Sequence, residues 1–333
     1  MKFLGVLFLL LTSWVWSEEN PYDKTDLNND YITTEALKKV EIPSIHEEVI
    51  PDEEYTEEQA AKELREALER KELIETKAAG LPFVILPHRP NYIMPFAYTE
   101  TPYEDPYEEV LQEQWPGFNN LEAIFQISLK YQIYKFDKDN KHRLYIAYTN
   151  KSYWQVYNSD ASRPFRETNH EPELLFQFSP NWGVVNRINL SFNHQSNGQY
   201  QGFSRSWNRI IVGMYHLEGN RVYGIEPWWR LPEKDTADPL DPTDDDNPDI
   251  TNYLGYANFI FFKKWKKYSG LLRFGNNLRE KNNRGWGELE FNFPVTPRVR
   301  GFIQYYEGYG HSLIEYNQYQ RRIGVGFKIS DYL

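Results

Sequence analysis

The chain has 333 residues, no cysteine and a net charge of −11 at pH 7. Without cysteine, disulfides, a thiol nucleophile and a zinc site built from thiolates are all excluded. The acidity is concentrated before residue 81, and no basic stripe follows that would suggest a nucleic-acid partner.

Residues 1–17 have the features of a secretory signal peptide. Lys2 is followed by the almost wholly apolar run Phe3–Leu11. Val15, Trp16 and Ser17 then provide a cleavage site. No later segment reaches the roughly 18 consecutive apolar residues that a membrane-spanning helix needs. If the mature chain lies in a membrane, it must therefore cross it as a β-barrel.

Residues 18–80 are predicted to form an acidic N-terminal extension, with 19 acidic and 8 basic residues. Up to Glu54, scattered prolines and the lack of a sustained hydrophobic period predict disorder. Thr56 and Gln59 then have the spacing of a capping box, and a thin apolar stripe predicts a helix to about Ala79. We interpret this helix as a solvated, charge-laced element; contact with a periplasmic partner is the alternative.

Residues 81–333 are predicted to form an all-β domain, a 12-stranded antiparallel transmembrane β-barrel. Short runs of alternating apolar and polar residues are separated by turns, and their number is even. An aromatic content of 17% fits interfacial girdles, and a mean hydropathy of −0.72 is compatible with strands that alternate. The predicted strands lie near Tyr92–Tyr98, Phe125–Ile133, Arg143–Gln155, Pro172–Ser179, Arg187–Ser196, Ser206–His216, Arg221–Arg230, Tyr253–Phe262, Tyr268–Asn276, Trp286–Phe293, Val299–Tyr306 and Gln320–Ile329.

The main chemical signal spans the two predicted strands joined by residues 197–205. Side chains two apart share a strand face, so His194 and Ser196 lie together on an apolar face, and Asn208 lies on the apolar face of the next strand. An imidazole, a hydroxyl and an amide have the composition of a base, a nucleophile and an orienting group. The joining segment is one of the long connections, which face outward in such barrels. In a soluble sheet the same groups would simply be hydrogen-bonded core residues.

The surrounding strings are more specific. The chain reads Asn-His-Gln-Ser-Asn-Gly at 193–198, Ser-Arg-Ser-Trp-Asn-Arg at 204–209 and Arg-Pro-Phe-Arg-Glu-Thr-Asn at 163–169. It also reads Asp-Asn-Pro-Asp-Ile at 246–250 and Gly-Tyr-Gly-His-Ser-Leu-Ile at 308–314. Together these strings resemble the outer-membrane phospholipase A family, from roughly residue 81 to the end.

The resemblance implies a calcium-dependent enzyme of the Gram-negative outer membrane that hydrolyses acyl ester bonds of phospholipids and lysophospholipids. It makes Ser196 the nucleophile, His194 the base and Asn208 the orienting residue. The backbone N–H of Gly198 takes the place of the family's oxyanion donor.

The resemblance also implies Ca2+ as the cofactor and homodimerisation as the activating event. Gln199 and Ser204 of one chain and Ser162 of the other would hold the catalytic calcium, and Asp246 matches a second calcium position used in the monomer. The family commonly has Arg at position 199, but the ligand there is a main-chain carbonyl. Asn150, where the family has Gln, would face a second copy of the chain.

Two other functions stay open at this point. A passive, porin-like channel is the main alternative, and a membrane-anchored binding or adhesion barrel is the third. Neither accounts for the matched strings. No Gly-X-Ser-X-Gly elbow or paired zinc histidines occur. The remaining histidines of the predicted barrel domain have no evident partners and are interpreted as structural: His88, His142, His170, His216 and His311.

Overall fold

A computed structural model describes residues 55–79, 81–105, 107–108, 116–137, 139, 141–180, 182–199, 201–234, 236 and 245–330. The predicted signal peptide and the acidic segment up to Glu54 lie outside the described residues. Among the described residues, no helix combines the length and apolar character needed to cross a lipid bilayer.

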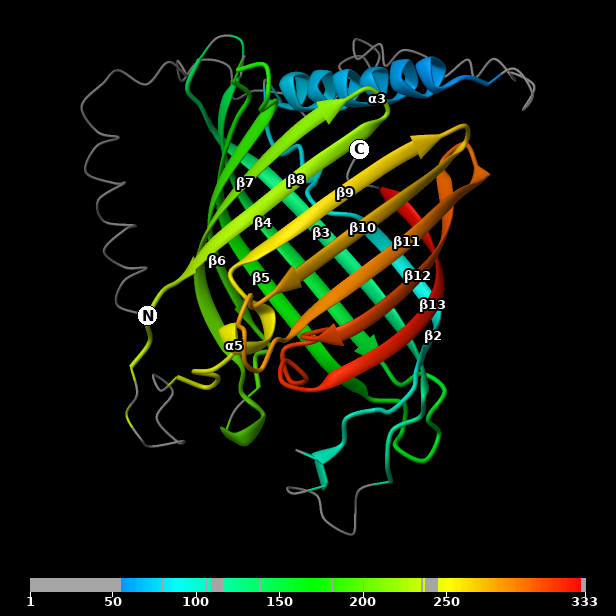
Figure 1. Ribbon diagram of the computed structural model, residues 1–333, viewed down its shortest axis with the longest axis vertical. Coiled ribbons are helices and arrows are strands. Elements are labelled where there is room, and N and C mark those ends of the chain that lie inside the picture. The colour runs from blue at the N-terminus through cyan, green and yellow to red at the C-terminus, as the bar shows by residue number, and fades with distance from the viewer. Residues whose placement is uncertain are drawn as a thin grey trace, which may run out of the picture. The chain divides into compact units, whose positions relative to one another are not determined.

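The described strands form one antiparallel sheet that closes on itself, because β13 pairs with β2 (Figure 1). The predicted 12-stranded barrel is thereby confirmed. A short further strand, β1 (Leu86–Pro87), pairs with β3 beyond the end of β2. The barrel strands are β2 (Asn91–Thr99), β3 (Leu121–Lys135), β4 (His142–Trp154), β5 (Phe165–Phe178), β6 (Arg187–Ser196), β7 (Ser206–Glu218), β8 (Arg221–Arg230), β9 (Ala257–Trp265), β10 (Tyr268–Asn276), β11 (Gly285–Thr296), β12 (Val299–Tyr309) and β13 (Tyr319–Ser330).

Alternation along β13 illustrates how the sequence specifies the two faces of the wall. Ile323, Val325 and Phe327 are exposed on the outside, whereas Arg322 and Lys328 are buried on the inside. Apolar side chains thus face lipid and charged side chains face the interior, as expected when the solvent outside is hydrocarbon.

Three predicted strand starts were wrong by four residues or more. The strand predicted near Phe125–Ile133 begins earlier, at Leu121. The strand predicted near Tyr253–Phe262 begins at Ala257, because Thr251–Leu254 form a helical turn, α5, that ends at Gly255 with a φ of 76°. The strand predicted near Pro172–Ser179 begins earlier, at Phe165. Its first half is polar because those side chains face the barrel interior or neighbouring polar groups rather than an apolar core.

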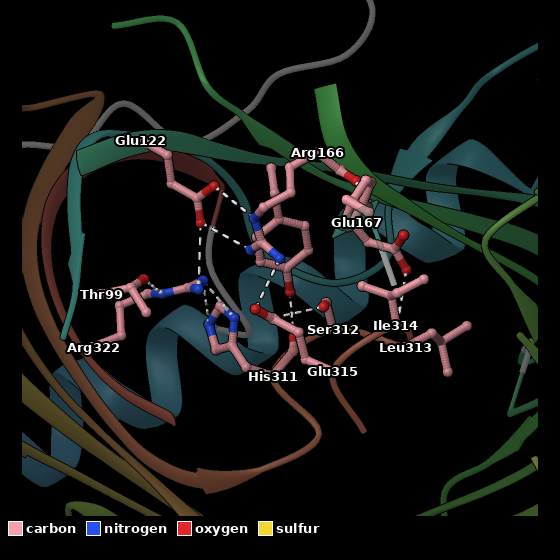
Figure 2. Close-up of polar contacts among 12 residues, drawn as sticks. Thr99, Glu122, Arg166, Glu167, His311, Ser312, Leu313, Ile314, Glu315 and Arg322 are labelled. Atoms are coloured by element: carbon pink, nitrogen blue, oxygen red, sulfur yellow. Dashed lines mark hydrogen bonds and ion pairs between the residues drawn. The ribbon is translucent and has the colours of Figure 1, made fainter. Parts of the chain in front are cut away.

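Short connections gather at one end of the barrel and long ones at the other. The loop 310–318 folds into the long-loop end, where Glu315 is fully buried. Arg166 pairs with both Glu315 and Glu122 (Figure 2). The two distances are 2.8 and 3.0 Å, and Arg322 lies 3.3 Å from Glu122. Two arginines and two glutamates therefore neutralise one another inside this end. His311 lies in the same loop and contacts Arg322, so the expectation that this histidine has no partner was wrong.

Helix α3 (Glu57–Ala78) lies across the short-turn end (Figure 1). Thr56 caps it, and the reciprocal bonds between Thr56 and Gln59 form the predicted capping box. Leu64 is buried against Phe262 and Leu271 of the barrel. The interpretation of α3 as a purely solvated element is therefore wrong for the face that meets the barrel, because that face buries apolar and charged groups.

Candidate active site

The hairpin of β6 and β7 carries the three residues predicted to form a catalytic triad. Its register places His194 opposite Asn208 and Ser196 opposite Ser206. On the same face as His194, Leu190 and Phe192 are exposed at 45% and 39%. Side chains of the other face, such as Asn193, are buried in the barrel interior. The predicted site therefore lies on the outer wall, which faces lipid.

His194 and Asn208 are in direct contact. The distance between His194 Nδ1 and Asn208 Oδ1 is 2.9 Å. Because a carbonyl oxygen only accepts, this contact requires the imidazole proton on Nδ1. The other ring nitrogen, Nε2, is then left with a lone pair and can act as a base.

Ser196 lies two residues beyond His194 on the same face. Its hydroxyl makes no hydrogen bond to another described residue, and catalytic hydrogen bonds are often loose before substrate binds. On its other side, Ser196 is the cross-strand neighbour of His170 on β5. His170 Nδ1 lies 2.6 Å from the hydroxyl of Tyr148, so the interpretation of His170 as a residue without a partner was also wrong.

The turn after Ser196 exposes a backbone donor. Gly198 has a φ of 66°, a conformation that favours glycine. The buried side chain of Asn197 holds the turn, accepting from the N–H of Arg205 at 3.0 Å and donating to the carbonyl of Phe203 at 2.7 Å. The Gly198 N–H makes no hydrogen bond to another described residue. It is therefore free to bind an oxyanion.

The predicted calcium ligands are brought together only in part. Ser204 donates to Asp246 Oδ2 at 2.7 Å, and Ser206 donates to the same oxygen at 3.4 Å. Gln199 is exposed in the same turn as Ser204. Ser162 lies in the loop between β4 and β5 and makes no hydrogen bond to the other three within the described part of the chain. One chain thus supplies an incomplete set of ligands.

This set is chemically suited to calcium. No cluster of three or more His, Asp or Glu side chains occurs in the described part of the chain. The hydroxyl of Ser204, the carboxylate of Asp246 and main-chain carbonyls are hard oxygen donors, which Ca2+ prefers. The donors present therefore fit Ca2+ better than a softer metal.

Glu233 belongs to the site but was not predicted. It lies in the segment after β8, and its Oε1 accepts a hydrogen bond from Asn208 Nδ2 at 2.6 Å. Burial raises the pKa of the Glu233 carboxyl, and Asp245 acts in the same direction, while Arg230 opposes both. Glu233 is a loop residue 25 positions after Asn208, and strand periodicity does not relate two such positions. The periodicity of the sequence therefore could not reveal that Glu233 contacts Asn208.

A cavity of about 790 Å3 lies elsewhere, inside the barrel between α3 and the loop 310–318. Its lining includes Glu72, Arg89, Glu173, Arg209 and Tyr316, and none of His194, Ser196 and Asn208. This cavity is therefore not where the predicted chemistry lies. A polar lumen is usual in outer-membrane barrels, so the cavity does not compete with the hydrogen-bonded site on the outer wall.

Comparison with known proteins then decides the family. The model of the Phospholipase A1 family matches residues 68–329. This chain belongs to that family. Phospholipase A1 of Klebsiella pneumoniae is 34% identical over 269 residues, which cover 75% of this chain and 84% of the relative. The family resemblance expected from the sequence is confirmed.

Solved structures of outer membrane phospholipases also have this fold. Outer membrane phospholipase A from Escherichia coli superposes with a TM-score of 0.68 at 32% identity, covering 76% of this chain and 94% of the other. The same protein has been solved as an active-site mutant with asparagine replaced by alanine. The Salmonella typhi enzyme, solved as a dimer with bound calcium, has a TM-score of 0.67 at 31% identity, covering 76% of this chain. This member of the Phospholipase A1 family is accordingly an outer-membrane enzyme that hydrolyses phospholipids.

Proposed function

We propose that the chain is a serine hydrolase that cleaves acyl ester bonds at either position of phospholipids and lysophospholipids, depends on calcium and is active as a homodimer. The observation that carries the serine mechanism is the contact between His194 Nδ1 and Asn208 Oδ1 on the lipid-facing wall. His194 is two residues before Ser196 on the same strand face. The active-site asparagine of the E. coli enzyme supports the same role for Asn208.

The chemistry follows from the proton positions. His194 Nε2 takes the proton of Ser196 as its Oγ attacks the ester carbonyl, and the imidazolium then protonates the leaving glycerol oxygen. The serine becomes acylated, and water activated by the same imidazole releases the fatty acid. The N–H of Gly198 donates to the oxyanion that forms at the carbonyl oxygen.

Asn208 provides an amide where serine-hydrolase triads usually have a carboxylate, and this is consistent with its position on the lipid-facing wall. A charged aspartate on a wall that faces hydrocarbon would carry a large desolvation cost. Asn208 is neutral, yet its carbonyl oxygen selects the same tautomer of His194. The amide therefore orients the base with less electrostatic penalty.

Calcium dependence is supported by the donor set of Ser204, Asp246 and the exposed turn at Gln199. A calcium ion bound beside this turn would supply positive charge close to the predicted oxyanion site. Ser162 makes no hydrogen bond to this set within the described part of one chain, which is consistent with its contribution from a second copy. The calcium-bound dimer of the S. typhi relative is consistent with this arrangement.

Dimerisation is further supported by Asn150 on β4. It follows Ile146 and Tyr148, which are exposed at 51% and 43% on the same face. Its Oδ1 accepts from Ser152, while its Nδ2 makes no hydrogen bond to another described residue. An amide facing lipid gains when it meets a partner, and a second Asn150 across a two-fold axis would provide one.

The test is fatty-acid release from phospholipid in mixed detergent micelles, with calcium and with a chelator. Ser196→Ala should remove activity, whereas Ser191→Ala, on the interior face of the same strand, should not. Product analysis of substrates with two different acyl chains would report the positions cleaved. Full activity of Ser196→Ala would refute the serine mechanism. The porin-like alternative gains no support, since buried ion pairs occupy the long-loop end and α3 crosses the other.

A further inference from the structure

The amide of Asn208 lies between two groups rather than one. Its Oδ1 is 2.9 Å from His194 Nδ1, and its Nδ2 donates to Glu233 Oε1 at 2.6 Å. The chain of contacts therefore continues past the orienting amide to the carboxylate of Glu233.

The contact with Glu233 affects the contact with His194, because the side-chain amide of Asn208 has an oxygen that accepts and an NH2 group that donates. If Asn208 rotated by 180° about its terminal bond, its NH2 group would meet His194 Nδ1. That arrangement would favour the other tautomer and place the proton on Nε2, where it would prevent the ring from acting as a base. An ionised carboxylate can only accept hydrogen bonds, so Glu233 holds the NH2 group on its own side.

Glu233 is itself held in place. The N–H of Leu231 donates to the carbonyl of Asn208 at 2.8 Å, which fixes the start of the loop against β7. Arg230 Nη2 lies 3.5 Å from Glu233 Oε2, and the side chains of both residues are mostly buried, at 12% and 17% exposure. Arg230 also pairs with Asp245, the neighbour of the predicted calcium ligand Asp246. The carboxylate thus has a charged partner and a fixed backbone.

We propose that Glu233 is a positioning residue that acts through Asn208 to hold His194 in its basic tautomer. This role rests on the proposed function of Ser196, His194 and Asn208. It extends the triad to a relay of four side chains, in which Glu233 touches neither the substrate nor the reacting atoms. Glu233 should then affect the rate of the chemical step and leave substrate binding nearly unchanged.

The experiment compares Glu233→Ala and Glu233→Gln with the unaltered protein, in detergent with saturating calcium. Glu233→Ala should lower kcat about tenfold, the scale of one hydrogen bond to a charged group, with KM within about twofold. Glu233→Gln can still accept from Asn208 but no longer excludes the reversed amide, so part of the loss should be recovered. Lys234→Ala, in the same loop and exposed, is the control and should behave as the unaltered protein.

A mutant cycle separates positioning from a general loss of structure. Labelling of Ser196 by a lipophilic fluorophosphonate measures slow reaction rates, and faster migration of the unboiled protein on a gel verifies the folded barrel. In an Asn208→Ala background, Glu233→Ala should have no further effect on labelling, because the amide through which it acts is gone.

The outcomes are distinct. An unchanged kcat in Glu233→Ala, a change confined to KM, no recovery in Glu233→Gln, or an undiminished loss in the Asn208→Ala background would each overturn the role of Glu233. If Ser196→Ala kept full activity, the proposed function would fail first. If Ser196→Ala were inactive while Glu233→Ala was normal, only the inference about Glu233 would fail.

Discussion

The carboxylate of Glu75, on helix α3, accepts a hydrogen bond from Lys130 inside the barrel at 2.8 Å. Both residues are almost fully buried, at 2% and 3% exposure. The second oxygen of Glu75 accepts from Arg143 of the next strand, also at 2.8 Å. The N-terminal helix is therefore joined to the barrel interior through buried charges.

The first prediction concerns stability. Glu75→Gln should destabilise the folded barrel by roughly 3 kcal/mol, because removing one partner leaves buried cations without compensation. Unfolding in denaturant, followed by tryptophan fluorescence and gel migration, measures the change. Glu66→Gln is the matched control on the same helix, because Glu66 is exposed and, among the described residues, forms one ion pair, with Lys62 at 3.9 Å. Equal stability of the two variants would contradict a role for the buried pair.

The second prediction is a pH dependence of that stability. Burial opposes ionisation of Glu75, but Lys130, Arg187 and Lys71 outweigh it and hold the pKa of Glu75 below its ordinary value. A carboxyl whose pKa is lower in the folded state stabilises the fold at any pH above its unfolded pKa. That contribution is lost as the pH falls through the folded pKa. Acidification should therefore reduce the stability of the unaltered protein more than that of Glu75→Gln.

The third prediction separates the extension from the chemistry. Removing residues 18–80 should leave kcat for fatty-acid release within about twofold, because the segment contributes no residue of the predicted site. The truncated barrel should unfold at lower denaturant concentration, because Lys130 and Arg143 lose the partner they have in Glu75. A truncated protein that folds, as judged by gel migration, but hydrolyses nothing would disprove the first part.

The fourth prediction concerns the triad. Ser196→Ala and His194→Ala should each lower kcat by at least about 1000-fold, because the nucleophile and base act as a unit. Asn208→Ala should retain more activity than either, because the amide only orients the ring. Initial rates in mixed micelles measure all three against Ser191→Ala. A Ser196→Ala protein with normal rates would remove Ser196 as the nucleophile.

The fifth prediction links calcium to dimerisation. If Ser162 completes the calcium site of a second copy, calcium binds the dimer better than the monomer, and by linkage it must favour the dimer equally. Activity and crosslinking yield should rise together with protein and calcium concentration. Ser162→Ala should need several-fold more calcium for half-maximal rate. Full activity of a calcium-saturated monomer at high dilution would count against the linkage.

Much of the wall could be predicted from local sequence. A strand exposes alternate side chains to alternate environments, so a period of two is enough to assign Ile323 to lipid and Arg322 to the interior. The same period places His194 and Ser196 on one face without any knowledge of the neighbouring strands. The segments Arg187–Ser196 and Arg221–Arg230 have the predicted bounds for this reason.

Local patterns failed where a long-range contact decides the conformation. Thr251–Leu254 continues an alternating run but forms a helical turn, whose residues Tyr253 and Leu254 pack beside the buried Ile250 and Tyr316. The polar start of β5 gave no clear strand signal because its apolar and polar positions are not separated by face. At both positions, contacts with distant parts of the chain determine the conformation, and the alternation of apolar and polar residues does not predict it.

Local sequence was enough to indicate the family, the alternating wall and the common face of His194 and Ser196. The contact of Asn208 with His194, the hydrogen bond from Asn208 to Glu233 and the entry of Glu75 into the barrel from α3 became visible in the folded structure. The physical reason is the range of the interactions. Hydrophobic periodicity is set by neighbours along the chain, whereas these polar contacts depend on sheet register, loop path and helix docking, which are fixed only when distant segments pack together.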